Sequence, residues 1–335
     1  GWATGIAILL CVLEIVFGAL LLLGIFRNFV VKGLLATIIF FTFLTFVSAA
    51  FKVVTSCGCF GDAIPLTPWQ SFSKDLVLLL LIVYLYLKKD WIKPVTEKPG
   101  VQSALFAAVF TASLMFGTFT YNYLPIIDFL PYKVGSNIPE NMKIPEGAPV
   151  DEYLIMYDLK NKKTGETKTM SDKEYMGKEV WKDDNWEVTG SPSRKLIKKG
   201  YDVKIKDLLI TDASGTDYTK EIVENPYYSL VVVAYNLNET SENAIANINA
   251  LALNAAEQFN IRTVLLTSSS ARDAEKFSKR MKLFMEVFYA DGVPLKSMVR
   301  ANPGVLLLKN GTIVNKWHYH SLPSFDQFTE KYFSK

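Results

Sequence analysis

The chain has 335 residues, of which 50% are hydrophobic and 21% are charged, and its formal net charge at pH 7 is +3. The apolar residues are concentrated in residues 1–124 and the remainder is polar, which excludes a single soluble domain. The small positive charge forms no basic stripe, so nucleic acid is not expected as a partner.

Four apolar segments predict a membrane α-helical bundle in residues 1–124. They are expected at about residues 2–26, 33–54, 76–87 and 101–124. Each is near the ~20 residues that cross a bilayer, although the third reaches this length only if residues 72–75 and Lys88 extend it. Buried helices of a large soluble protein are the alternative, and four such segments in so short a stretch disfavour it.

The charges between these segments predict the orientation of the bundle. Arg27 and Lys32 lie between the first two segments and four lysines follow the third, whereas Lys74 is the single cation between the second and third. Cytoplasmic loops carry the excess of Lys and Arg. The loop between the second and third segments, and everything after the fourth, should therefore face outward. The chain then starts outside, which predicts a further upstream helix and five helices natively.

The outward loop contains the sequence SCGCFGD, residues 56–62, with two of the three cysteines of the chain. Gly58 and Gly61 permit backbone conformations that other residues avoid. A disulfide between Cys57 and Cys59 would close a very small, strained ring, and strained, exposed disulfides exchange readily. In an oxidising compartment, this predicts thiol–disulfide exchange with Cys57 and Cys59 as catalytic residues. A static disulfide that pins the loop is the alternative.

The remaining candidate metal ligands and thiols, and the lysine before the pair, do not add a second reactive site. Two thiolates do not complete a zinc site, which takes four ligands, and the two histidines, His318 and His320, are distant in sequence, so no metal is expected. Lys52, one turn before the cysteines, could stabilise a thiolate or extend to the headgroups. Cys11 lies in mid-span and is expected to be inert packing.

Glu14 lies in the middle of the first span, where an ionisable group indicates a functional site. It could relay protons or hydrogen-bond a ring oxygen of a quinone, the one cofactor that the redox chemistry suggests, although no quinone motif is present. A structural hydrogen bond to Thr42 or Thr45 of a neighbouring helix is the alternative. Transport of a small molecule would depend on Glu14 alone.

The outer half of the chain divides into two expected regions. Residues 125–203 are a Pro-rich linker followed by short strands, and residues 204–335 alternate buried strands with helices. The strongest signals are a β-branched run at 227–235, a helix at 241–260 with Ser241 as N-cap, and an Asn310-Gly311 hairpin turn. This alternation predicts an α/β layered domain.

The order of elements in residues 204–333 resembles the thioredoxin fold. Asn302-Pro303, before the predicted hairpin, matches the thioredoxin proline that is usually cis, and the resemblance implies a peptide-binding groove beside it. It also implies a Cys-x-x-Cys at the start of the helix that follows the strand at 227–235, but here Thr240 and Asn243 occupy those positions. We therefore expect a periplasmic thioredoxin-like domain that lacks the dithiol and binds a partner or caps the membrane part.

Residues of about 8–150 resemble the DoxX/MauE-like family in the form found in Bacteroidetes. The specific part is CGCFGDAIPLTPWQSFSKDL, residues 57–76. The resemblance implies a multi-pass protein of the bacterial inner membrane that exchanges disulfides with a protein partner in the membrane or periplasm. A non-enzymatic accessory or scaffold subunit of an envelope complex is the alternative, favoured by the missing Cys-x-x-Cys. The expected domains are residues 1–124, 125–203 and 204–335.

Overall fold

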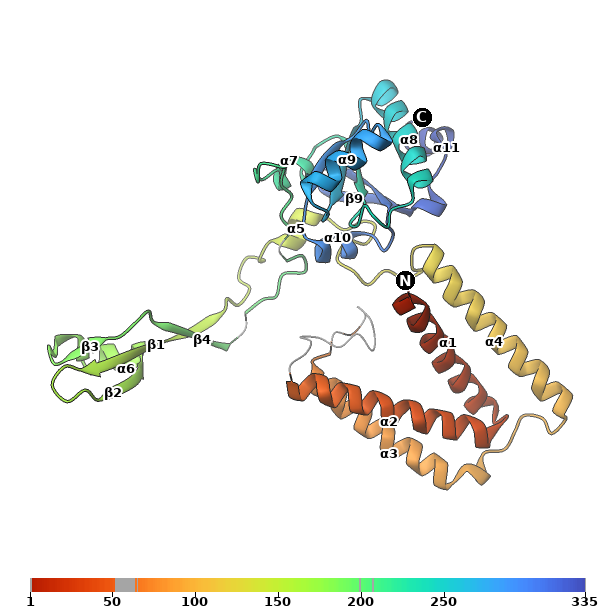
Figure 1. Ribbon diagram of the computed structural model, residues 1–335, viewed down its shortest axis with the longest axis horizontal. Coiled ribbons are helices and arrows are strands. Elements are labelled where there is room, and N and C mark those ends of the chain that lie inside the picture. Colours follow the sequence, from red (N-terminus) through yellow and green to blue (C-terminus); the bar gives the residue numbers. More distant parts are fainter. Residues whose placement is uncertain (1, 52–63, 65, 199, 207, 335) are drawn as a thin grey trace. The chain divides into compact units, whose positions relative to one another are not determined.

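The computed structural model describes residues 2–51, 64, 66–198, 200–206 and 208–334 (Figure 1). The chain divides into one unit of Gly1–Ser136 with Leu209–Lys335 and a second unit of Asn137–Leu208. The first unit contains four long helices and an α/β domain, and the second contains a small sheet. The domain boundaries expected after residues 124 and 203 stay predictions.

Four long helices form the N-terminal part, as predicted. They are α1 (Trp2–Leu23), α2 (Arg27–Phe51), α3 (Pro68–Leu87) and α4 (Pro99–Asn122). All four are long and apolar enough to cross a membrane. The third starts earlier than expected because Thr67 caps it, and residues 72–75 belong to it. Arg27 and Lys32 lie on α2 rather than in a loop, because the turn before α2 is only residues 24–26.

The tight turn between α1 and α2 requires glycine. Gly24 has φ of 66°, and a Cβ atom there would lie 2.3 Å from the carbonyl oxygen of Lys93. The Leu23 carbonyl, at the end of α1, accepts a hydrogen bond of 3.0 Å from the Val95 backbone N–H. The end of α1 and the chain after α3 are therefore held together.

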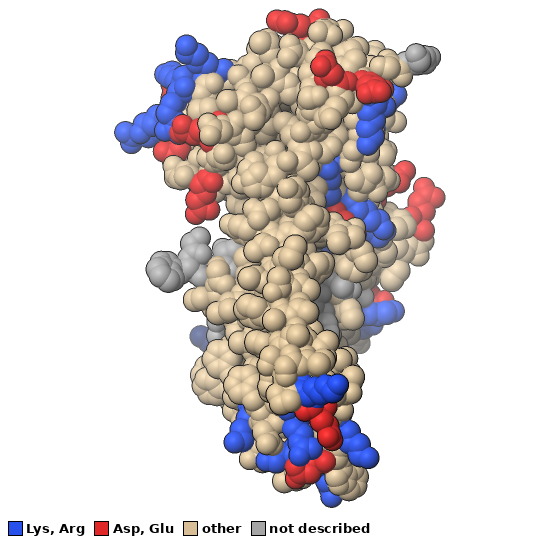
Figure 2. All heavy atoms as spheres, turned by 90° about the vertical axis from the view of Figure 1, so that its right-hand side faces the viewer, with Lys and Arg blue, Asp and Glu red and all other residues tan. Residues whose placement is uncertain are grey.

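Helices α3 and α4 bury polar residues and expose apolar ones. The buried residues of α3 are Ser71 and Asp75, and that of α4 is Ser113, whereas Leu80 is 65% exposed. A soluble protein shows the opposite arrangement, but in a bilayer the exposed side chains contact lipid. Figure 2 shows a broad surface without charged side chains and, below it, a group in which Lys and Arg are mixed with Asp and Glu. The N-terminal part is thus a membrane-spanning bundle.

Residues 209–334 fold into an α/β domain around a five-stranded sheet. Its main elements are β5 (Tyr228–Val233), α8 (Glu242–Phe259), β6 (Arg262–Thr267), α9 (Ala271–Met281), β7 (Glu286–Tyr289), α10 (Gly292–Met298), β8 (Gly304–Lys309), β9 (Thr312–His318) and α11 (Phe325–Tyr332), preceded by the short α7 (Thr219–Val223). The strand order is β7-β6-β5-β8-β9. Strands β5, β6 and β7 are parallel, and β8 pairs antiparallel with β5 and β9. Helices α8, α9 and α11 share one buried apolar cluster with the sheet.

The local sequence explains these elements. Residues 230–233 of β5 are at most 2% exposed, as a central strand requires. Helix α8 begins at its N-cap Ser241, whose hydroxyl accepts a hydrogen bond of 3.3 Å from the Ala244 N–H. The turn between β8 and β9 places Asn310 at φ of 47° and Gly311 at φ of 76°, the left-handed pair typical of a two-residue hairpin.

The Asn302-Pro303 peptide bond is cis and immediately precedes β8, as predicted. Helix α8 follows the central strand β5, and the β8–β9 hairpin leads into α11. This connectivity, with a cis-proline at the entrance of the hairpin, is that of the thioredoxin fold.

The segment after α4 is anchored along β9. The Gly135 N–H donates to the Ile313 carbonyl at 2.8 Å, and the Ile313 N–H donates to the Ser136 carbonyl at 2.9 Å. Lys316 of β9 forms an ion pair with Asp128, and these side chains are only 7% and 15% exposed. A buried charge without its partner is strongly unfavourable, so this pair fixes the segment on the domain.

The second unit contains a small antiparallel sheet, which supplies the short strands expected there. Its elements are α5 (Ile138–Met142), β1 (Glu152–Asn161), β2 (Thr167–Ser171), α6 (Asp172–Gly177), β3 (Trp186–Val188) and β4 (Ser193–Lys198). Strand β1 pairs with all three other strands. The short 3₁₀ segments of the chain are Lys89–Trp91, Val180–Lys182 and Tyr319–Ser321.

We expect Leu80→Arg to impair insertion of α3, because a charge near the centre of a span is unfavourable by about 3 kcal/mol. Insertion is measured with glycosylation sites placed on either side of α3. The matched control is Leu87→Arg: Leu87 is 71% exposed at the end of the helix, where Arg can reach the headgroups. Equal insertion of both variants would show that Leu80 does not face lipid.

Candidate functional site

The predicted catalytic pair, Cys57 and Cys59, and the neighbouring Lys52 lie outside the described residues. Their segment joins the end of α2 to the start of α3. The start of α3 is fixed by a capping box, in which the Gln70 N–H donates to the Thr67 hydroxyl at 3.3 Å and the Thr67 N–H donates to the Gln70 side chain at 2.9 Å. The roles of the three residues stay predictions.

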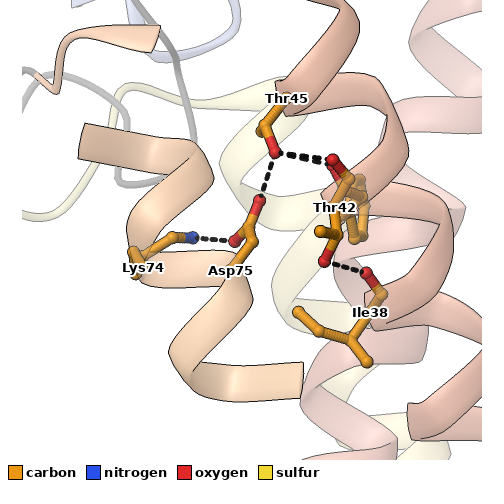
Figure 3. A network of polar contacts seen from close by, with 6 residues as sticks. Ile38, Thr42, Thr45, Lys74 and Asp75 are labelled. Atoms are coloured by element: carbon orange, nitrogen blue, oxygen red, sulfur yellow. Dashed lines mark hydrogen bonds and ion pairs between the residues drawn. The ribbon is translucent and has the colours of Figure 1, made fainter. Parts of the chain in front are cut away.

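A polar network joins α2 and α3 (Figure 3). The Thr45 hydroxyl lies 2.9 Å from Oδ2 of Asp75 and 2.9 Å from the Phe41 carbonyl oxygen. Lys74 Nζ lies 2.8 Å from Oδ1 of Asp75. Asp75 is 1% exposed. Both oxygens of a buried carboxylate are thus engaged, one by a neutral donor and one by a cation.

Two further hydroxyls lie along the same seam. Ser71 is 0% exposed, and it precedes Asp75 by one helical turn on α3. Ser48 follows Thr45 by about one turn on α2. The side-chain oxygens of Ser48 and Ser71 are buried and have no hydrogen-bond partner among the described residues. The seam therefore contains more polar groups than its protein contacts satisfy.

Sequence reasoning missed this network because the third span was expected to start after Asp75. With α3 beginning at Pro68, Asp75 lies on the second turn of a membrane helix. An acidic residue inside a span is the signal that could have identified it. Thr42 and Thr45 are the partners considered in the alternative interpretation of Glu14. Instead, Thr45 contacts Asp75, and the Thr42 hydroxyl donates to the Ile38 carbonyl at 2.7 Å.

Glu14 and Cys11 lie on α1 with exposed side chains. A proton-relay or quinone-binding role for Glu14 stays a prediction. Cys11 has a free thiol and is exposed on α1, and its role as inert packing stays a prediction.

A second polar cluster occupies the position of the thioredoxin dithiol. The Thr240 hydroxyl, 2.7 Å from the Asn236 carbonyl oxygen, also lies 3.2 Å from Oδ1 of Asn302. Asn302 Nδ2 donates to the Asn236 carbonyl at 2.8 Å. Thr240 is 7% exposed. The structure thus brings the predicted Thr240 next to the residue that precedes the cis-proline, and hydrogen bonds hold the loop where thioredoxins carry sulfur.

The two histidines lie together at the end of β9. His318 is 4% exposed, and its Nδ1 accepts a hydrogen bond of 3.2 Å from the His320 N–H. Burial, with a smaller effect from the charge of His320, lowers the pKa of His318 from 6.5 to about 4. His318 is therefore neutral at physiological pH.

Residues 1–88 match the family model described as methylamine utilisation protein MauE. The N-terminal part of the chain is MauE-like. The matched region contains α1, α2 and α3 and the segment with Cys57 and Cys59. Both the Thr45–Asp75 contact and Glu14 therefore belong to the MauE-like part. No curated protein matches the chain.

Several solved structures are similar to the chain that follows the MauE-like part. A thiol:disulfide interchange protein from Bacteroides sp. is 16% identical with a TM-score of 0.30, covering 37% of this chain and 84% of that one. A peroxiredoxin-like protein from Aquifex aeolicus is 10% identical with a TM-score of 0.29, covering 37% and 80%. A secreted Mycobacterium tuberculosis disulfide oxidoreductase is 14% identical with a TM-score of 0.29, covering 37% and 93%. The thioredoxin fold itself rests on the strand order and the cis-proline.

We expect Asn302→Ala to lower the free energy of unfolding of the α/β domain by about 1–3 kcal/mol, because it removes the hydrogen bonds that the Asn302 side chain makes with the Asn236 backbone and the Thr240 hydroxyl. The full-length protein is unfolded with denaturant, and the unfolding of the domain is monitored by its loss of protease resistance. Asn238→Ala is the matched control, since its side chain is exposed in the same loop. Equal losses in both variants would contradict a special role for Asn302.

The low pKa of His318 predicts that the α/β domain loses stability as pH falls from 6.5 towards 4. In this window the unfolded state binds more protons, so stability is fully present above pH 6.5 and declines by up to roughly 3 kcal/mol. The test measures the free energy of unfolding of the wild type, His318→Gln and His320→Gln between pH 6.5 and pH 4. The loss should be smaller in His318→Gln and largely retained in His320→Gln, and an unchanged pH profile in His318→Gln would be the contrary result.

Proposed function

We propose that the protein is a multi-pass protein of the bacterial inner membrane whose Cys57 and Cys59 exchange disulfides with a protein partner on the periplasmic side. The observation that carries this proposal is the position of the pair. Two cysteines, separated by one glycine, lie in the segment that joins two membrane-spanning helices of a MauE-like part.

The positive charges support an outward position for this segment. Arg27 begins α2, and its guanidinium lies 3.3 Å from the Asp90 carboxylate and donates to the Ile92 carbonyl at 3.1 Å. Lysines surround the end of α3 at the same end of the helix pair. Because the positive end is cytoplasmic, the opposite end, between Phe51 and Pro68, would face the oxidising side, where disulfides persist.

The exchange has two balanced steps. The thiolate of one cysteine attacks a partner disulfide, so that a mixed disulfide forms and one partner thiolate leaves. The second cysteine, as a thiolate, then attacks the mixed disulfide, which closes the Cys57–Cys59 bond and releases the second partner thiolate. Two electrons move to the partner, and protons released by the two cysteines balance those taken up by the partner thiolates. The reverse sequence oxidises a dithiol partner.

The thioredoxin-like domain would serve recognition rather than electron transfer. Thr240 and Asn243 stand where a dithiol would act, and neither can form a disulfide. The surface beside Asn302 and Pro303 would hold an extended segment of the partner. The segment 128–136, which is anchored on β9, would keep this surface within reach of the membrane.

The hydrogen-bonded Thr240 favours a second candidate function, that of a non-enzymatic accessory subunit of an envelope complex. In that case the Cys57–Cys59 bond would be static, and the bundle and the domain would bind partners without redox change. The two functions differ in whether the cysteine pair changes redox state.

We expect Cys57→Ser or Cys59→Ser to trap a mixed disulfide, because the remaining cysteine can attack a partner but cannot resolve the product. Acid-quenched membranes are alkylated and separated without reductant, and the trapped partner is identified after mild-detergent purification. Cys11→Ser is the matched control, since Cys11 lies on α1 outside the segment. A permanently oxidised pair, together with normal complex assembly in both serine variants, would favour the accessory subunit instead.

A further inference from the structure

We propose that the segment after α4, residues 124–129, inserts its apolar side chains into the lipid surface next to the bundle and so holds one edge of the α/β domain at the membrane. We call this segment the interfacial loop. The proposal goes beyond the proposed exchange, because it applies whether or not the cysteine pair changes its redox state.

The interfacial loop exposes three large apolar side chains. Ile126, Ile127 and Phe129 are 74%, 66% and 60% exposed. Adjacent apolar side chains that are exposed to this degree mark a surface that contacts another molecule. Asp128 is the only charged residue from residue 99 to residue 132, so the apolar character of the last span continues into the loop.

The position of the loop in the chain places it at the edge of the bilayer. Helix α4 has 24 residues and is therefore about 36 Å long, whereas the hydrocarbon core is about 30 Å thick. The end of α4 at Asn122 thus lies at or just beyond the edge of the core, and Ile126 follows a few residues later. The chain bends at Ile126 and Ile127 rather than running straight away from the helix. Lipid is therefore the nearest apolar phase for these side chains.

The ion pair between Asp128 and Lys316 sets the direction in which the loop points. The side chain of Asp128 is 15% exposed and contacts Lys316 of β9, whose side chain is 7% exposed. On either side of Asp128, Ile127 and Phe129 remain exposed. The one charge of the loop is thus turned toward the domain, and the apolar side chains are left to face outward.

The chain after the loop is joined firmly to the domain. Leu130 and Tyr132 are 8% and 2% exposed, and Lys316 Nζ donates to the Tyr132 carbonyl at 3.1 Å. Together with the hydrogen bond from Gly135 to Ile313, these contacts hold the chain along β9, which is an edge strand of the sheet. A loop inserted in lipid therefore keeps this edge of the domain at the membrane surface.

Lipid fits the exposed surface of the loop better than a protein partner does. Met115, Phe119 and Tyr123 follow one another at intervals of one helical turn, so they share one side of α4, and they are 66%, 44% and 39% exposed. This row leads directly into the loop, and aromatic residues such as Tyr123 are enriched where a span meets the headgroups. The loop is thus continuous with the side of the bundle that lipid already covers.

Photocrosslinking of the full-length protein in cell membranes tests which molecule contacts the loop. The photoreactive residue p-benzoylphenylalanine replaces Ile127, and adducts with lipid and with protein are separated and identified by mass spectrometry. Tyr227 is the matched control, because it is 77% exposed and precedes β5 at the end of the sheet opposite His318. We expect lipid adducts to be about tenfold more abundant at residue 127 than at residue 227, since apolar side chains of interfacial segments lie at the boundary of headgroups and acyl chains.

Two outcomes of the crosslinking would overturn the proposal. Equal yields of lipid adducts at residues 127 and 227 would show that the loop does not enter lipid. A protein adduct at residue 127, without a lipid adduct, would assign the surface to a protein partner instead.

Hydrogen exchange in lipid nanodiscs tests whether the loop holds the domain. We expect the double variant Ile126→Ser/Ile127→Ser to exchange the backbone amides of residues 124–130 about tenfold faster than the wild type, because the loop loses the contacts that keep it closed. Tyr227→Ser should leave these amides unchanged. The amides of β5, measured in the same experiment, report that the domain remains folded. Unchanged exchange of residues 124–130 in the folded double variant would contradict a role of lipid in holding the loop.

Discussion

The membrane part depends on satisfying its polar side chains inside the bundle, and the hydrogen bond between Thr45 and Asp75 is the main example. Lipid offers no hydrogen-bond partners, so a polar side chain in a span must find its partner on another helix or in enclosed water. Asp75 meets this constraint with Thr45 on α2 and Lys74 on its own helix. The same constraint explains why α3 buries Ser71 and Asp75 while its leucines remain exposed. Helices α2 and α3, which precede and follow the cysteine segment in the chain, are thus joined through Asp75.

The α/β domain shows how a fold can persist after its usual chemistry has gone. The cis-proline, the central strand β5 and the start of α8 are arranged as in thioredoxins. Where thioredoxins have a thiol, the Thr240 hydroxyl contacts the Asn236 carbonyl and the Asn302 side chain. The Asn302 side chain also donates to the Asn236 carbonyl. Such a cluster of hydroxyl and amide groups stabilises the loop but cannot undergo thiol–disulfide exchange. Recognition and electron transfer would then lie in separate parts of one chain, and the partner would have to reach both.

The fold was largely predictable because its strongest signals are local. The four spans follow from the length of the apolar segments, the β8–β9 hairpin from Asn310-Gly311, and the start of α8 from Ser241. The boundaries were less predictable: α2 includes Arg27 and Lys32, and α3 begins at Pro68 rather than near Leu76. Charged and polar residues at a span end resemble a loop in sequence, and only the capping hydrogen bonds of Thr67 and Gln70 show that the helix has already begun.

The sequence by itself determined the spans, the thioredoxin-like order of elements, the loss of the dithiol and the location of the cysteine pair between two helices. These follow from apolar length, periodicity and residue identity, which act over short stretches of chain. Only the tertiary structure decided which polar groups meet: Thr45 with Asp75 rather than with Glu14, Lys316 with Asp128, and Thr240 with Asn302. Such pairs join residues that are 30 to 188 positions apart, so their partners depend on how helices and strands pack.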